Sequence, residues 1–208
     1  AIYSLRAGVG EKLQSYVELA EFTINESLES ILEGIWKRQP EVIGFSCYIW
    51  NWKLIREILT ELPKILPDTE IWLGGPEVTY DGPGLLKEFP QVTGIMVGEG
   101  EVTFREVLEQ YLREAETVGQ SEQQPEPDSI EQRAADREET VVEKTVAERF
   151  GQIPGLCLAS GYTAPRDLTD LTTLPFLYEN MEPFTNRIIY YETSRGCPYR
   201  CSYCLSSI

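Results

Sequence analysis

The chain has 208 residues, of which 42% are hydrophobic, and its 18 Lys and Arg residues are outnumbered by 34 Asp and Glu residues, for a formal net charge of −16. This charge would repel a phosphate backbone or an anionic membrane surface, so we expect no direct nucleic-acid partner and no membrane partner. The sequence contains no apolar run that would span a bilayer and opens with no signal peptide, which predicts a cytoplasmic protein. Histidine is absent, so the usual general base and every His-ligated metal site are excluded, and chemistry must come from cysteine or from a cofactor.

Residues 1–113 alternate short apolar runs with helical patterns, which is typical of a parallel sheet covered by helices on both faces. The expected strands are Tyr16–Ile24, Val42–Cys47, Ile71–Leu73 and Gly94–Val97. The expected helices begin near Ile2, span Leu28–Ile35, Leu54–Leu62 with an end at Pro63, a short stretch around Leu85 and Leu86, and Val102–Arg113. The predicted fold class is therefore α/β, with a doubly wound sheet of the Rossmann or flavodoxin-like kind.

The start of the chain differs from that of an ordinary doubly wound domain. Such a domain normally opens with a strand that becomes central, whereas this chain opens with a helical pattern and with Ala rather than Met. We therefore expect the sheet to lack its first strand. Without that strand, backbone N–H and C=O groups of the neighbouring strand would lack hydrogen-bond partners, and apolar side chains would be exposed. Both effects would lower the stability of the domain.

The composition changes after Arg113. Residues 114–148 hold eleven acidic and three basic side chains and no aromatic one. This predicts a solvated acidic linker or insertion over residues 114–150, helical at most near Val141–Phe150, with an acidic docking arm as the alternative. Residues 151–187 are expected to form a connector with a strand or hairpin starting near Ile153. Ile188–Thr193 is a new β run.

Three cysteines lie close together after this β run. Cys197, Cys201 and Cys204 have C-x-x-x-C-x-x-C spacing, whereas Cys47 and Cys157 lie in apolar runs typical of buried cysteine. Structural zinc sites and ordinary ferredoxin clusters require four protein ligands, so three thiolates indicate a cluster with one iron left open. A zinc loop, or a chance grouping of cysteines, is the alternative.

The segment from Glu192 to Cys204, with an aromatic residue before the last cysteine, resembles the signature of the radical SAM superfamily. The resemblance implies that Cys197, Cys201 and Cys204 hold a [4Fe-4S] cluster whose open iron binds S-adenosylmethionine, with the Tyr203 backbone near the adenine. It also implies a reductant such as flavodoxin or ferredoxin and a small-molecule or unknown substrate. Residues 188–208 would be the first strand and cluster loop of a radical SAM barrel. Because the sequence ends four residues after the last cysteine, we expect no turnover from this chain alone.

Ligands of open α/β sheets bind beyond the carboxyl ends of the strands, so the loops that follow three of the predicted strands are candidate binding sites. Glycines let a ligand approach the backbone, a serine offers a hydroxyl, and aromatic side chains offer apolar faces. Each loop alone also fits a tight turn, a capping serine or a core aromatic. The candidate binding residues are Ser46, Tyr48 and Trp50, then Gly74, Gly75 and Pro76, and then Gly98, Glu99, Gly100 and Glu101.

Together with the cysteine loop, these strand-end segments are similar to the cobalamin-binding domain of class B radical SAM proteins. The resemblance implies a cobalamin cofactor that these loops contact and, since the chain has no histidine, a cobalt without a protein histidine ligand. It implies a cobalamin-dependent radical SAM enzyme of the methyltransferase kind. One alternative is a radical SAM enzyme whose α/β domain binds no cobalamin. Another is a receiver-like signalling or interaction domain, which would need a phosphoacceptor Asp where the strand ends at Ser46.

Overall fold

The computed structural model describes residues 1–121, 144–178, 181–192, 194–197, 199 and 201. The chain divides into two compact units, residues 1–175 and residues 176–208. Within the described residues, no helix is both long and apolar enough to cross a membrane.

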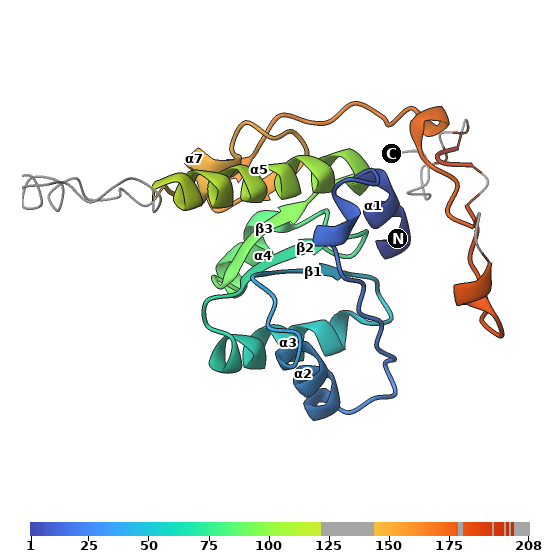
Figure 1. The fold of residues 1–208 in the computed structure, drawn as a ribbon, viewed down its shortest axis with the longest axis horizontal. Coiled ribbons are helices and arrows are strands. Elements are labelled where there is room, and N and C mark those ends of the chain that lie inside the picture. Colours follow the sequence, from blue (N-terminus) through green and yellow to red (C-terminus); the bar gives the residue numbers. More distant parts are fainter. Residues whose placement is uncertain (122–143, 179–180, 193, 198, 200, 202–208) are drawn as a thin grey trace, which may run out of the picture. The chain divides into compact units, whose positions relative to one another are not determined.

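The first unit is built on a five-stranded mixed sheet with the order β1-β2-β3-β4-β5 (Figure 1). The first three strands are parallel, β4 is antiparallel to β3, and β5 completes a hairpin with β4. The predicted α/β class is confirmed. Where a strand or a hairpin was expected after Ile153, the structure has a hairpin, which adds an antiparallel edge to the sheet. The strands are β1 (Val42–Ser46), β2 (Glu70–Gly74), β3 (Val92–Met96), β4 (Leu156–Leu158) and β5 (Gly161–Tyr162).

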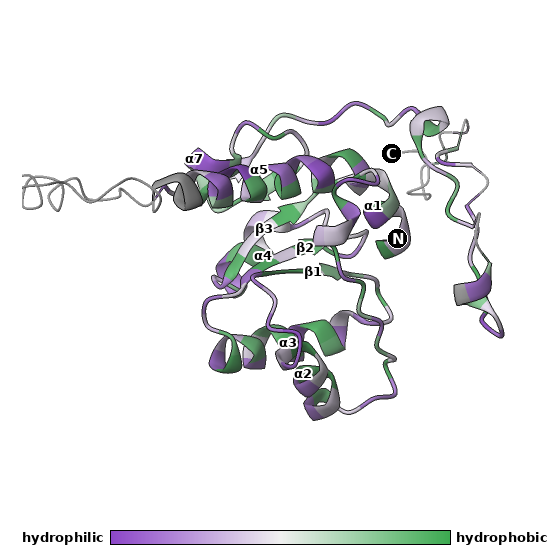
Figure 2. Ribbon diagram, viewed as in Figure 1, coloured by the Kyte–Doolittle hydropathy of each residue, from purple (hydrophilic) through white to green (hydrophobic). Residues whose placement is uncertain are grey.

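Helices cover both faces of this sheet (Figure 1). On one face, α2 (Leu28–Trp36), α3 (Trp52–Ile65) and α4 (Gly82–Glu88) share a buried apolar cluster with the strands. On the other face, a second cluster joins the sheet to α5 (Gly100–Ser121) and α7 (Val146–Phe150). Figure 2 shows β1 as hydrophobic and α2, α3 and α5 as alternating between hydrophobic and hydrophilic residues, as expected for helices with one buried face. The other helical segments among the described residues of this unit are α1 (Ile2–Gly8), which packs on α5, and the 3₁₀ turns Gln14–Tyr16 and Leu171–Thr173.

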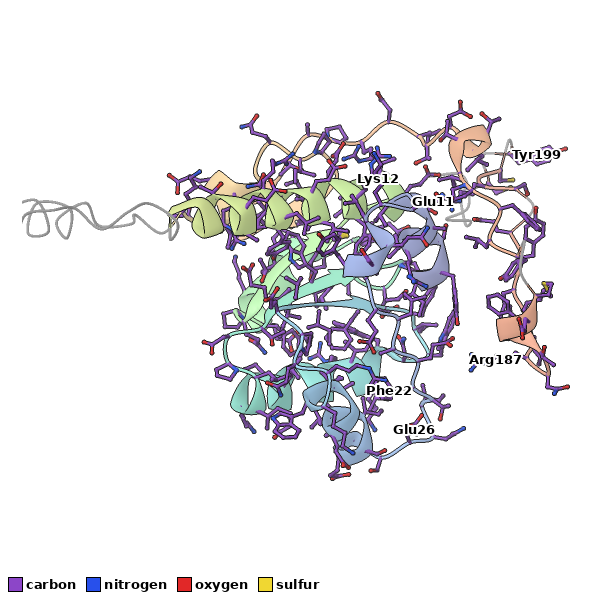
Figure 3. All side chains as sticks on the ribbon, in the orientation of Figure 1. Glu11, Lys12, Phe22, Glu26, Arg187 and Tyr199 are labelled. Atoms are coloured by element: carbon purple, nitrogen blue, oxygen red, sulfur yellow. The ribbon has the colours of Figure 1, made fainter. Side chains whose placement is uncertain are left out.

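The strand predicted over Tyr16–Ile24 is wrong. Its apolar side chains Val17, Leu19 and Phe22 are half-buried while most of their neighbours are exposed, but the segment joins no sheet. Phe22 (Figure 3) instead packs against α2, because a Cβ on Gly34 would lie only 2.7 Å from its ring. The burial of Phe22 therefore comes from packing on a helix, and among the described strands β1 pairs only with β2.

The predicted end of α3 at Pro63 is also wrong, since the helix continues to Ile65. A proline has no N–H with which to bond the carbonyl of Leu59 one turn earlier. The side-chain amide of Gln91 donates to that carbonyl at 2.7 Å instead. The Leu59 carbonyl, which Pro63 cannot pair, therefore has a hydrogen-bond donor from outside the helix.

The predicted linker begins inside a helix, because α5 extends beyond Arg113 to Ser121. Of the acidic residues just after Arg113, Glu116 is exposed, whereas Glu114 forms an ion pair of 2.9 Å with Arg149 of α7. Arg149 also pairs with Glu70 at 2.7 Å, and its neighbour Phe150 is fully buried. A capping box begins α7 at Thr145, which confirms a helix at the end of the predicted stretch. Residues 122–143 lie outside the described residues.

The second unit contains the short 3₁₀ helix Glu182–Phe184 and a group of edge-to-face aromatic rings. Tyr178 donates a hydrogen bond of 2.6 Å to the carbonyl of Tyr190. The strand predicted over Ile188–Thr193 is not formed: residues 188–192 belong to no sheet, and Ile188 is 84% exposed. A strand needs a neighbour for its backbone groups, and no described residue supplies one here.

Candidate functional site

The register of the parallel strands brings the three candidate loops to one edge of the sheet. Ser46 at the end of β1 pairs with Gly74 at the end of β2, and Gly74 pairs with Met96 at the end of β3. The loops that follow therefore leave the sheet at the same level, as the sequence predicted. This carboxyl edge is where open α/β sheets bind their ligands.

The loop between β1 and α3 presents an aromatic surface. The rings of Tyr48 and Trp50 are stacked, with centroids 4.5 Å apart and planes at 10°. Trp50 is 64% exposed and Ile49 is 78% exposed, and Tyr80 of the neighbouring β2–α4 loop is 61% exposed. Large exposed apolar side chains grouped at one edge are typical of a binding surface.

Asn51 holds this loop in shape, a role that the sequence did not reveal. Its Oδ1 accepts a hydrogen bond of 2.8 Å from the Tyr48 N–H, and its Nδ2 donates one of 2.9 Å to the Ser46 carbonyl. An asparagine directly before a helix predicts an N-cap, but here the side chain makes no cap bond to α3. The Ser46 hydroxyl has no hydrogen-bond partner among the described residues, so it remains available to a ligand.

In the loop after β2, glycine is required by packing within the protein. Gly75 has a φ of +107°, and a Cβ there would lie 2.5 Å from the Cys47 carbonyl oxygen. The Cys47 N–H donates to the Gly74 carbonyl at 2.7 Å, which ties the first two loops together. Pro76 is exposed beyond this contact.

The loop after β3 has an open glycine flanked by anchored carboxylates. Gly98 has a φ of +81° and is exposed, and no described atom lies within 4 Å of a Cβ built there, so a ligand can approach the backbone. Glu99 accepts a hydrogen bond of 2.6 Å from the Thr169 N–H. Glu101 is buried and accepts one of 2.8 Å from Ser4 of α1. Both carboxylates thus have protein partners, and their contact with a cofactor stays a prediction, as does that of Gly100, which packs against Leu5.

The cysteines separate into two environments. Cys197 and Cys201 are exposed, and Cys204 and Tyr203 lie outside the described residues. Cys47 and Cys157 are fully buried, and burial raises the pKa of both thiols, to about 12 for Cys47. Neither buried thiol is suited to act as a nucleophile or as a fourth metal-binding thiolate. Where the chain is described, no group of three His, Cys, Asp or Glu side chains is placed to hold a metal ion.

The chemistry of the carboxyl edge suits binding better than proton transfer. It offers an open glycine backbone, a free hydroxyl and stacked aromatic rings. Such a combination accommodates a large ligand that is partly apolar and partly hydrogen-bonding.

Comparison with known proteins finds one family whose model matches most of the first unit. Residues 7–108 match the B12 binding domain family. The first unit thus has an α/β fold that is consistent with the flavodoxin-like fold of B12-binding domains.

Three relatives extend the likeness over most of the chain. The cobalamin-dependent radical SAM methyltransferase TokK of Streptomyces tokunonensis is 29% identical over 186 residues, covering 80% of this chain and 22% of its own. The 2-(S-pantetheinyl)-carbapenam-3-carboxylate methyltransferase of Streptantibioticus cattleyicolor is 28% identical, covering 86% and 24%. An uncharacterized methyltransferase of Pyrococcus horikoshii is 23% identical, covering 88% and 35%. The chain thus spans between a fifth and about a third of these relatives, and its resemblance to radical SAM proteins with a cobalamin-binding domain is confirmed.

Proposed function

We propose that the first unit binds cobalamin at the carboxyl edge of its sheet and that the chain is part of a cobalamin-dependent radical SAM methyltransferase. The observation that carries the proposal is the coincidence of the B12 binding domain match over residues 7–108 with an edge that has an open glycine and exposed aromatic rings. The name of TokK, whose match covers 80% of this chain, supports the same reaction class.

Each loop has a separate part in the proposed cobalamin site. Gly98 admits the cofactor to the backbone after β3, and the Ser46 hydroxyl donates or accepts a hydrogen bond at the end of β1. Trp50, stacked on Tyr48, provides an apolar face. Gly75 and Asn51 keep the first two loops in place. The residues thus bind, orient and shield the cofactor, and no histidine of this chain ligates its metal.

For the second unit, the proposal assigns Cys197, Cys201 and Cys204 to a [4Fe-4S] cluster that binds S-adenosylmethionine, with Tyr203 beside the adenine. The C-x-x-x-C-x-x-C spacing and the exposure of Cys197 and Cys201 support it. When bound, cobalamin would carry a methyl group and the cluster would deliver one electron to S-adenosylmethionine. The electron donor is proposed to be a flavodoxin or ferredoxin, and the substrate a small molecule.

Two parts of the proposal, cluster binding and cobalamin binding, can be tested separately. The 208-residue chain is reconstituted anaerobically with iron and sulfide and is then dialysed to equilibrium against hydroxocobalamin. We expect close to one cobalamin and one cluster per chain. Cys197→Ser should lose the cluster and retain cobalamin, because the two sites use different residues. A wild-type chain that takes up a cluster but no cobalamin would favour a radical SAM enzyme without this cofactor. Tetrahedral zinc at the cysteines would contradict the cluster assignment.

A further inference from the structure

An extended segment, residues 163–170, runs along the turn between β3 and α5; we name it the strap. Its main anchor is Arg166, whose side chain is only 14% exposed. The guanidinium donates to the Thr103 hydroxyl at 2.7 Å and to the Pro154 carbonyl at 3.1 Å, and it forms an ion pair with Glu106. Thr103 and Glu106 both belong to α5, so Arg166 fixes the strap to the start of that helix.

The strap is also bonded to the turn itself. The Thr169 N–H donates to Glu99 at 2.6 Å. The Ala164 carbonyl accepts from the Gly155 N–H at 2.8 Å, and the Gly155 carbonyl accepts from the Val97 N–H at the same distance. These bonds connect the strap to the residues on both sides of Gly98. The conformation of the turn therefore depends on where the strap lies.

Polar contacts, and little apolar burial, hold the strap. It contains no helix or strand, and its apolar residue Leu168 is 89% exposed. Thr103, by contrast, is fully buried, so losing Arg166 would leave its hydroxyl with only the long bond of 3.4 Å that it donates to the Pro154 carbonyl. A segment ordered in this way opens more readily than the core beneath it.

We propose that the strap positions the proposed cobalamin loop, with Arg166 as its positioning residue. This inference rests on the proposed function. By holding Glu99 and the first turn of α5, the strap keeps the Gly98 backbone in the conformation that admits the cofactor. Cofactor binding in turn favours the conformation in which the strap is bonded to the turn, because a ligand that binds one conformation raises the population of that conformation.

Hydrogen exchange and cofactor binding, measured on the 208-residue chain, test the inference. Arg166→Gln removes the anchor, and Glu106→Gln weakens it at a half-buried site where misfolding is not expected. Arg56→Gln is the matched control, since it removes an ion pair with Glu88 on the surface of α3 and α4, away from the turn. The readouts are exchange of the amides of residues 163–169, hydroxocobalamin affinity and the urea midpoint.

Both strap variants should speed exchange in residues 163–169 and weaken hydroxocobalamin binding, Arg166→Gln by about tenfold or more, since the apparent affinity falls with the competent fraction. Cobalamin should slow the same exchange in the wild type, and Arg56→Gln should change neither readout. Faster exchange with unchanged affinity, or unchanged exchange in both variants, would overturn the inference and leave the proposed function standing. A wild-type chain that binds no hydroxocobalamin would overturn the proposed function and the inference together.

Discussion

Gly75 lies so close to Cys47 that a Cβ on Gly75 would sit 2.5 Å from the Cys47 carbonyl oxygen. The glycine also has a φ of +107°, which side chains disfavour. Gly75→Ala should therefore lower the free energy of unfolding by about 2–4 kcal/mol, from backbone strain and steric overlap together. Urea denaturation followed by circular dichroism measures the change.

Gly44→Ala is the control for this prediction. Gly44 lies in β1, has no positive φ, and a Cβ there would meet no described atom within 4 Å. We expect its unfolding free energy to change by no more than about 1 kcal/mol. Equal effects of the two substitutions would show that the contact between the loops is unimportant.

Trp50→Ala should weaken cobalamin binding without destabilising the fold. The side chain is 64% exposed, so its removal should alter the unfolding free energy by only about 0.5 kcal/mol or less. Loss of the stacked aromatic face should raise the Kd for hydroxocobalamin about tenfold, or about 1.4 kcal/mol. Trp36→Ala, at a 50% exposed position on α2, is the control and should bind like the wild type. Indistinguishable affinities of the two variants would remove Trp50 from the site.

The cysteines should differ in reactivity. At pH 8, iodoacetamide should modify the exposed Cys197 and Cys201 in the native chain and leave the buried Cys47 and Cys157 unmodified until the protein is unfolded. Peptide mass spectrometry after timed labelling identifies each site. Rapid native labelling of Cys47 would be inconsistent with its burial.

The pKa of Cys47, raised by burial from 9.0 to about 12, predicts a pH dependence of stability. Between these values the folded chain retains a proton that the unfolded chain has lost, so stability is fully present below pH 9 and falls as pH rises towards 12. Cys47→Ala should make this decline shallower than it is in the wild type. Urea midpoints at a series of alkaline pH values provide the test. An unchanged slope in Cys47→Ala would mean that its thiol does not titrate in this way.

Apolar runs bounded by turn residues were enough to predict β1, β2 and β3, because a strand buried on both faces must be apolar along its length. The same signal failed at Tyr16–Ile24, where alternation reflects packing of Phe22 on a helix, and at Ile188–Thr193, where the described residues provide no partner strand. A local sequence pattern indicates which side chains are buried, but it does not indicate whether a neighbouring strand is present.

For the candidate site too, local sequence pattern predicted some features and missed others. Strand ends and glycines predicted which loops share an edge, since parallel strands place their carboxyl ends together. The partners of individual side chains depended on tertiary contacts that no local pattern contains. Glu101 bonds to Ser4, 97 positions away, and the carbonyl left free by Pro63 accepts from Gln91.

The most direct test of a cobalamin site at the carboxyl edge compares two glycines that have a positive φ and no described neighbouring atom within 4 Å of a Cβ built on them. Gly98, with φ of +81°, lies at the carboxyl edge, whereas Gly161, with φ of +119°, follows the β4–β5 turn at the opposite edge of the sheet. Valine should strain either backbone, but only at Gly98 should it occupy the space that the cofactor needs. In a hydroxocobalamin titration of the 208-residue chain, we expect binding by the wild type and Gly161→Val and a loss of about tenfold or more in affinity for Gly98→Val. Absence of binding by the wild type, or equal affinity of the two variants, would contradict a cobalamin site at this edge.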